Sequence, residues 1–233
     1  MNNLAILQAL VFEPRKAFGE LDARPRFWWP LLLLVISQMV VTFWYMSFVD
    51  LEWLVDQQLS SSTFGANMTA EESARVARQA AEQGGMRAVI STVAVAILYP
   101  IILLIGALYY MLATKITGVE RSFRHWFSLS CWATIPVVLA LIPAAIVLLT
   151  ASGNQIPQEA LQPLSFNELL FHRSPGDPGY ALFANMNLFQ VASVYLGAMG
   201  VKTWSGRSWV YAIVITALPA VLIYGIWAFF ALR

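Results

Sequence analysis

The chain has 233 residues, of which 59% are apolar and only 12% are charged. A water-soluble domain carries about twice that share of charged residues, so the composition indicates an integral membrane protein. The net charge of +1 argues against a strongly basic nucleic-acid surface, and the single cysteine, Cys131, excludes an intramolecular disulfide and a cysteine-based zinc site.

Five stretches are long and apolar enough to cross a bilayer, which takes about 20 helical residues. All five are free of charged residues, and prolines in three of them are expected to kink the helices. We therefore expect an all-α fold, a polytopic transmembrane helical bundle. The expected spans are residues 28–48, 88–113, 127–150, 182–201 and 209–232.

Basic residues alternate in number between the segments that join these spans. Nine of the 14 lie before the first span and in the two short connectors that follow the second and fourth spans. Because basic residues gather on the cytoplasmic side of a membrane protein, we expect a cytoplasmic N-terminus. With five spans, the C-terminus is expected to lie outside.

Residues 1–27 are expected to form a cytoplasmic segment ahead of the transmembrane domain at 28–233. The apolar run in it is short and follows no positive charge, so it is not a signal peptide. The periodicity predicts an amphipathic helix at the membrane interface, with Phe18 and Leu21 continuing the lipid contact. The helix residues that share the apolar face are Leu4, Leu7, Leu10 and Val11.

The first outer loop contains the pattern of a capping box. Thr69 and Glu72 stand three residues apart and precede an alanine-rich run that stops at Gly84. Glu71 and Arg75 form an i,i+4 pair that favours the same helix. The second outer loop is rich in proline and glycine, which predicts irregular structure.

The spans contain no ionisable group of the kind that marks proton relays and ion pathways. The chain also has none of the HExxH, GxSxG or glycine-rich phosphate motifs, and both histidines lie outside the spans. We therefore expect no enzymatic activity, no cofactor and no metal.

Polar residues within the spans most often form hydrogen bonds between helices. Ser130 and Thr134 share one face of the third span, and Asn187 and Gln190 share one face of the fourth. If these faces meet, they form a polar pocket for a lipid headgroup or a solute. Small residues at four-residue spacing, such as Ser193 and Gly197, indicate close helix packing within the chain or between two copies.

The connector after the second span places basic residues beside aromatic ones. Arg121 and Arg124 flank Phe123, and Trp126 follows. This combination suits the anionic inner surface of a membrane. A docking site for a cytoplasmic or membrane protein partner is the alternative.

Three segments carry a resemblance to the Yip domain family, named for Ypt-interacting proteins. The first joins the N-terminal segment to a Trp-Pro start of the first span; the second runs through Gly118, Ser122 and Pro136; the third joins two helices at Gly206. The segments are VFEPRKAFGELDARPRFWWPLLL, LLIGALYYMLATKITGVERSFRHWFSLSCWATIPVVL and LFANMNLFQVASVYLGAMGVKTWSGRSWVYAIVITALP.

The resemblance implies a five-helix membrane protein with a cytoplasmic N-terminus. Eukaryotic relatives are associated with Rab-type GTPases and vesicle traffic, and often self-associate. The N-terminal segment of 27 residues is shorter than theirs and is similar to the bacterial branch, which implies the inner membrane.

We therefore expect a non-enzymatic protein that organises membrane lipid or partner proteins, with a homo-oligomer as one form. The alternatives are a channel or facilitative transporter that uses the polar pocket, and an accessory subunit of an enzyme.

Overall fold

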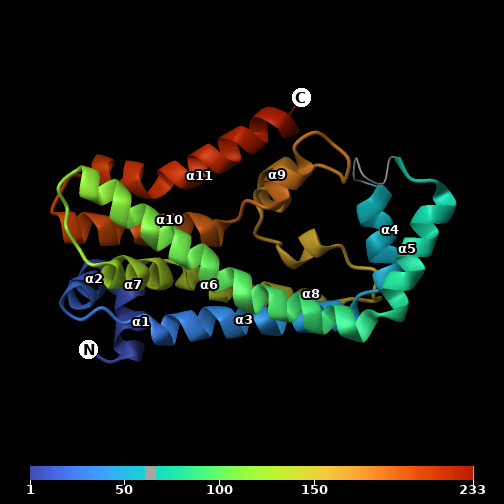
Figure 1. The fold of residues 1–233 in the computed structure, drawn as a ribbon, viewed down its shortest axis with the longest axis horizontal. Coiled ribbons are helices and arrows are strands. Elements are labelled where there is room, and N and C mark those ends of the chain that lie inside the picture. Colours follow the sequence, from blue (N-terminus) through green and yellow to red (C-terminus); the bar gives the residue numbers. More distant parts are fainter. Residues whose placement is uncertain (61–66, 233) are drawn as a thin grey trace. The chain divides into compact units, whose positions relative to one another are not determined.

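A computed structural model describes residues 1–60 and 67–232 of the chain, drawn from blue to red in Figure 1. All regular secondary structure in these residues is helical, and one isolated bridge joins Ser165 to Asn187. The all-α prediction is confirmed. The elements are α1 (Asn3–Phe12), α2 (Pro14–Ala23), α3 (Trp28–Phe48), α4 (Leu51–Ser60), α5 (Ala70–Glu82), α6 (Gly84–Ile116), α7 (Phe123–Ala133), the 3₁₀-helix η2 (Ile135–Ala140), α8 (Leu141–Thr150), the 3₁₀-helix η3 (Gln158–Leu161), the π-helix η4 (Asn167–Phe171), α9 (Tyr180–Ala184), α10 (Leu188–Ser205) and α11 (Trp209–Ala231).

Four helical segments in the described chain are long and apolar enough to cross a membrane. They are α3, α6, the run Phe123–Thr150 that comprises α7, η2 and α8, and α11. Their outer faces are apolar, since Ile102, Val210 and Ile223 are each more than half exposed. Such a large exposed apolar surface marks a protein that meets lipid. The prediction of a multi-pass membrane protein is therefore confirmed.

The stretch expected as the fourth span, 182–201, is broken in the structure. Helix α9 ends at Ala184, and α10 begins only at Leu188 and has 18 residues. Helix α10 is not among the four candidate spans found in the described residues, because Gln190, Ser193 and Lys202 lower its hydropathy. The count of five spans and the outer C-terminus stay predictions, and Arg233 lies outside the described residues.

Proline changes the course of the third span, as expected. Helix α7 ends at Ala133, and Ile135–Ala140 forms tighter 3₁₀ turns before α8 begins. The change falls at Pro136, whose ring nitrogen has no hydrogen to donate to the helix ladder. Pro100 and Pro219, in contrast, lie inside α6 and α11, which continue through them.

The chain divides into two compact units, and each has its own hydrophobic core. Trp126, Leu129 and Val201 are fully buried in the first core, and Leu51, Leu54 and Leu148 are buried in the second. The first unit comprises Met1–Ile36, Ile97–Leu139 and Leu188–Phe230, and the second comprises Ser37–Ala96, Ala140–Asn187 and Ala231–Arg233.

The N-terminal helices belong to the core of the first unit. Helix α1 is present as predicted, but it buries Ile6, Ala9 and Leu10 and leaves Leu4 and Val11 exposed. Helix α2 packs against α7 and α10.

The sequence-based expectation of lipid contact for Phe18 and Leu21 is wrong, because both side chains have no exposed surface. Their α2 face is covered by protein, and the apolar character that suggested lipid reflects this packing.

The second unit contains one predicted helix and one that the sequence analysis missed. In α5 the capping box is present, with the Glu72 amide donating to Thr69 Oγ1 and the Thr69 amide donating to the Glu72 carboxylate. Helix α4 was not expected. Its start is held by Asp50, whose Oδ1 accepts from the amide of Trp53 at 3.1 Å and whose own amide donates to the Asn154 carbonyl.

Candidate functional site

The connector between α6 and α7 meets helices α2 and α10 in the first unit. Five residues from α2, the connector, the start of α7 and α10 form what we call the connector cluster: Asp22, Arg121, His125, Trp126 and Trp204. They lie where the sequence predicted a lipid or partner contact, and Figure 1 shows α2 beside the start of α7.

A two-pronged ion pair joins the connector to α2. The Arg121 Nε donates to Asp22 Oδ1 at 2.7 Å, and Nη2 donates to Asp22 Oδ2 at 3.0 Å. The same Nη2 donates to the Trp204 carbonyl at the end of α10, at 3.3 Å. The hydrogen bond to Asp22 raises the pKa of the Arg121 guanidinium above its ordinary value. Arg121 therefore ties three elements together, with about a third of its side chain exposed.

His125 forms a hydrogen bond with the backbone of Asp22, the residue whose side chain pairs with Arg121. Its Nε2 lies 3.1 Å from the Asp22 carbonyl oxygen, and its Nδ1 lies 2.7 Å from Ser122 Oγ. A carbonyl oxygen can only accept, so Nε2 carries a proton and donates it to Asp22, while Nδ1 pairs with the Ser122 hydroxyl. The imidazole is thus held on both sides by structural hydrogen bonds.

The tryptophans of the connector cluster are internal. Trp126 is fully buried, with its ring 5.4 Å from Trp204 and 6.1 Å from Tyr110 between ring centroids. The Trp204 indole donates to the Phe18 carbonyl at 2.7 Å. The expectation that Trp126 contacts lipid or a partner is wrong, because its ring is enclosed by aromatic side chains of the first unit.

Arg124 stays available at the surface. Its side chain is exposed, and its guanidinium lies 6.0 Å from the centroid of the Phe27 ring. Five further basic side chains are exposed as well, in the segments before α3, in the last turn of α6 and between α10 and α11. With Arg124 they form what we call the basic end: Arg15, Lys16, Arg24, Lys115, Arg124 and Arg207.

The basic end carries a net positive charge and large apolar side chains. The segments expected in the cytoplasm hold nine basic residues against four acidic ones, and Arg121 has already neutralised one acid, Asp22. Val11, Phe12 and Ile116 are among the most exposed apolar residues, at 71%, 81% and 87%. This pairing of positive charge with exposed apolar side chains suits the headgroup layer of a membrane.

Three of the four residues of the expected polar pocket have hydrogen-bonded side chains in the structure, whereas the buried Ser130 Oγ has no hydrogen-bond partner among the described residues. Thr134 Oγ1 donates to the Ser130 carbonyl within its own helix at 2.7 Å. Gln190 accepts from the Tyr224 hydroxyl of α11 at 3.1 Å.

Asn187 belongs to the second unit and donates to Gln162 at 3.0 Å, whereas the other three belong to the first unit. A pocket formed by all four residues therefore stays a prediction.

The sequence analysis did not connect Asp22 or Trp204 with the connector. Asp22 lies 99 residues from Arg121, so no local pattern relates them. One signal was available: the segments expected in the cytoplasm contain only four acidic residues, and a partly buried arginine needs one of them as its partner.

A family model for the Yip1 domain matches residues 8–230 of the chain. The matched range contains the second half of α1, all of α2 and the whole connector cluster. The chain matches no curated protein and no solved structure.

Proposed function

Since the chain belongs to the Yip1 domain family, we propose that it is a non-enzymatic membrane protein that organises lipid and proteins around it. The basic end is its contact with anionic lipid headgroups. The observation that carries this proposal is a contrast among the basic residues: Arg121 is paired with Asp22 within the fold, while Arg24 and Arg124 are exposed.

Electrostatics and the hydrophobic effect act together at such a surface. Each basic residue near an anionic leaflet contributes about 1 kcal/mol of attraction, and exposed apolar side chains add to it by entering the interface. Phe12 and Ile116 are exposed in the same unit as the basic residues. These contacts give a preference for anionic lipid without a closed pocket.

The geometry of the connector cluster supports a structural role over a catalytic one. The Asp22 carboxylate is occupied by Arg121, and His125 meets the Asp22 backbone carbonyl in place of the carboxylate. A general base needs an imidazole that is free to take up a proton at the reacting group. Here both ring nitrogens of His125 are held by the fold.

The experiment compares two double variants of the full chain in nanodiscs of mixed phosphatidylglycerol and phosphatidylethanolamine. Arg24→Gln/Arg124→Gln removes two charges from the basic end. Arg75→Gln/Arg78→Gln is the matched control, because both arginines are exposed on α5 in the expected outer loop. Native mass spectrometry then counts the lipids that stay bound and shows whether the chain self-associates.

We expect the wild type to retain phosphatidylglycerol over phosphatidylethanolamine, and this preference to fall about 30-fold in the first variant, which loses two charges worth about 1 kcal/mol each. The control variant keeps it. Equal retention of both lipids by the wild type contradicts the proposal. So does a solute flux in liposomes that disappears in Asn187→Leu/Gln190→Leu, because that result assigns the chain to the channel alternative.

A further inference from the structure

The second unit contains a cavity of about 410 Å³ that the proposed function does not use. It lies among α4, η3, the turn at 175–179 and the start of α9. Its volume falls in the range typical of small-molecule sites. The side chains that give it its chemical character are Gln57, Gln58, Gln158, Glu159, Asp177 and Tyr180.

The charge of the cavity is negative. Its lining residues in the described chain include two carboxylates and no lysine or arginine. Asp177 is engaged, since its Oδ2 accepts from the Ser174 amide at 2.8 Å. The half-buried Glu159 carboxylate has no hydrogen bond or ion pair with any described residue.

Arg173, the one basic side chain between Ala151 and Gly179 apart from His172, is hydrogen-bonded to a residue of the cavity wall. It donates to the Pro178 carbonyl and lies 5.5 Å from the Phe183 ring.

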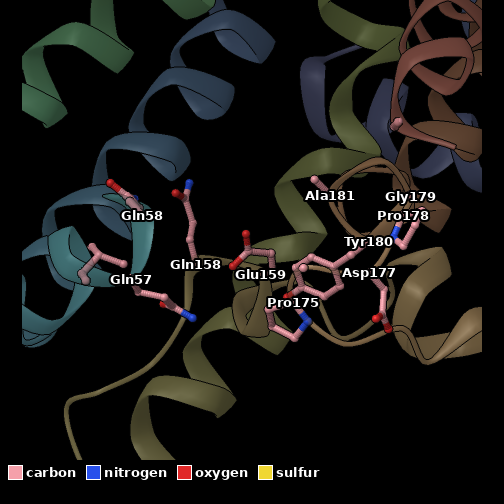
Figure 2. A pocket seen from close by; sticks show the side chains of 13 residues that line it. Gln57, Gln58, Gln158, Glu159, Pro175, Asp177, Pro178, Gly179, Tyr180 and Ala181 are labelled. Carbon is pink, nitrogen blue, oxygen red and sulfur yellow. The ribbon is translucent and has the colours of Figure 1, made fainter. Parts of the chain in front are cut away.

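Tyr180 lies beside the Glu159 carboxylate, on the side away from Gln158. In Figure 2 Glu159 lies between Gln158 and the ring of Tyr180. Burial raises the pKa of the Tyr180 phenol, and the negative charges of Glu159 and then of Glu168 raise it further. A carboxylate beside an aromatic ring attracts a cation, because the ring face carries negative potential. Leu54 and Pro175 line the same cavity and suit the carbon atoms of an organic cation.

The turn that precedes Tyr180 is fixed by a backbone hydrogen bond and by a glycine with positive φ. Tyr180 donates its amide to the Asp177 carbonyl at 3.0 Å. Gly179 has a φ of +81°, and a Cβ there would lie 2.6 Å from Leu232, so glycine is required at this turn. A preformed wall reduces the entropy lost when a ligand binds.

We propose that this cavity binds an organic cation that carries an ammonium group, held by the Glu159 carboxylate and the ring of Tyr180. A free amine and the ammonium headgroup of a lipid share this chemistry. The site is independent of the basic end and of the proposed function.

The test measures binding of choline and of ethanolamine to the full chain in detergent by equilibrium dialysis. A second arm uses nanodiscs with phosphatidylcholine or phosphatidylethanolamine, read by native mass spectrometry. Glu159→Gln removes the charge with little change in shape. Glu82→Gln removes an equal charge from an exposed position on α5, in the same unit but outside the cavity lining, and Tyr180→Phe keeps the ring while Tyr180→Leu removes it.

We expect Glu159→Gln to weaken binding about ten-fold and Tyr180→Leu about five-fold, whereas Glu82→Gln and Tyr180→Phe bind nearly as the wild type does. Binding in the first arm identifies a free cation, and binding in the second arm alone identifies a lipid headgroup.

If Glu159→Gln fails to fold, Gln58→Lys replaces it, because an exposed lysine on α4 competes for the carboxylate and should also abolish binding. No binding in either arm, or binding that neither Glu159→Gln nor Gln58→Lys weakens, overturns the proposal.

Discussion

Gly200 is where α10 comes closest to its neighbours in the first unit. A Cβ at this position would lie 2.2 Å from Leu129 Cδ1 and 3.1 Å from Phe18 Cδ1. Both neighbours are fully buried, so neither side chain has space into which to move. Gly200→Ala should therefore push α10 away from α2 and α7 and disturb the connector cluster.

The size of the effect follows from two opposing contributions. Overpacking a closed core with one methyl group costs about 1–3 kcal/mol, and a gap of 2.2 Å places Gly200 at the upper end. Alanine recovers about 1 kcal/mol through its higher helix propensity. We expect a net loss of about 2 kcal/mol, which lowers the melting temperature of a chain of this size by about 4–8 °C.

The assay is thermal unfolding in detergent, followed by tryptophan fluorescence, because Trp126 and Trp204 report on the affected core. Gly225→Ala is the matched control: Gly225 also lies in a long apolar helix, and nothing lies within 4 Å of its Cβ position. The control should melt at or above the wild type. A Gly200→Ala protein that melts as high as the wild type refutes the close packing of α10.

Three other changes test separate parts of the structure. A double-mutant cycle of Asp22→Asn and Arg121→Gln should give a coupling free energy of about 1 kcal/mol, because the pair is two-pronged but about a third exposed; additive losses in chemical denaturation contradict the pair. Thr69→Ala should speed amide exchange in the first turn of α5 several-fold, and unchanged exchange argues against the capping box. Hydrogen bonds from the Trp53 amide, and then from Gln155, lower the pKa of Asp50. The stabilisation from the charged Asp50 carboxylate is therefore present above the ordinary carboxyl pKa of about 4 and is lost as pH falls through the lower pKa of the folded state. Asp50→Asn should flatten the fall in unfolding free energy at acid pH, measured by chemical denaturation across pH.

The elements that sequence reasoning predicted well are those with a local signal. The Thr69 and Glu72 pair starts α5 because both partners of the capping box lie within one turn. Four of the five expected spans coincide with long apolar helices, because an uninterrupted run of about 20 apolar residues matches the thickness of the bilayer core. The stretch expected as the fourth span has a weaker apolar signal, since Asn185, Asn187 and Gln190 are polar.

The elements that were misread depend on which neighbour covers an apolar side chain. In a membrane protein an apolar side chain can be covered by lipid or by another helix. The pattern around Phe18 and Leu21 therefore predicts that both are shielded from water, but it does not distinguish lipid from protein as the neighbour. Trp126 follows two arginines, as an interfacial anchor would, but Trp204 and Tyr110 enclose it. The ion pair of Arg121 required a partner 99 residues away, which only the folded chain brings near.

Contact of the basic end with anionic headgroups requires that the basic end lie on the cytoplasmic side of the membrane. Single cysteines at Glu120 in the α6–α7 connector and at Gln79 on α5, both exposed positions, can be labelled in intact cells with an impermeant thiol reagent. The native Cys131 is fully buried, so it should contribute little background.

We expect Gln79→Cys to react in intact cells, Glu120→Cys to react only after the membrane is opened, and Leu232→Cys to react from outside if α10 crosses the bilayer. Labelling of Glu120→Cys in intact cells, with Gln79→Cys protected, would contradict the account, because the basic end would then face away from the anionic inner leaflet.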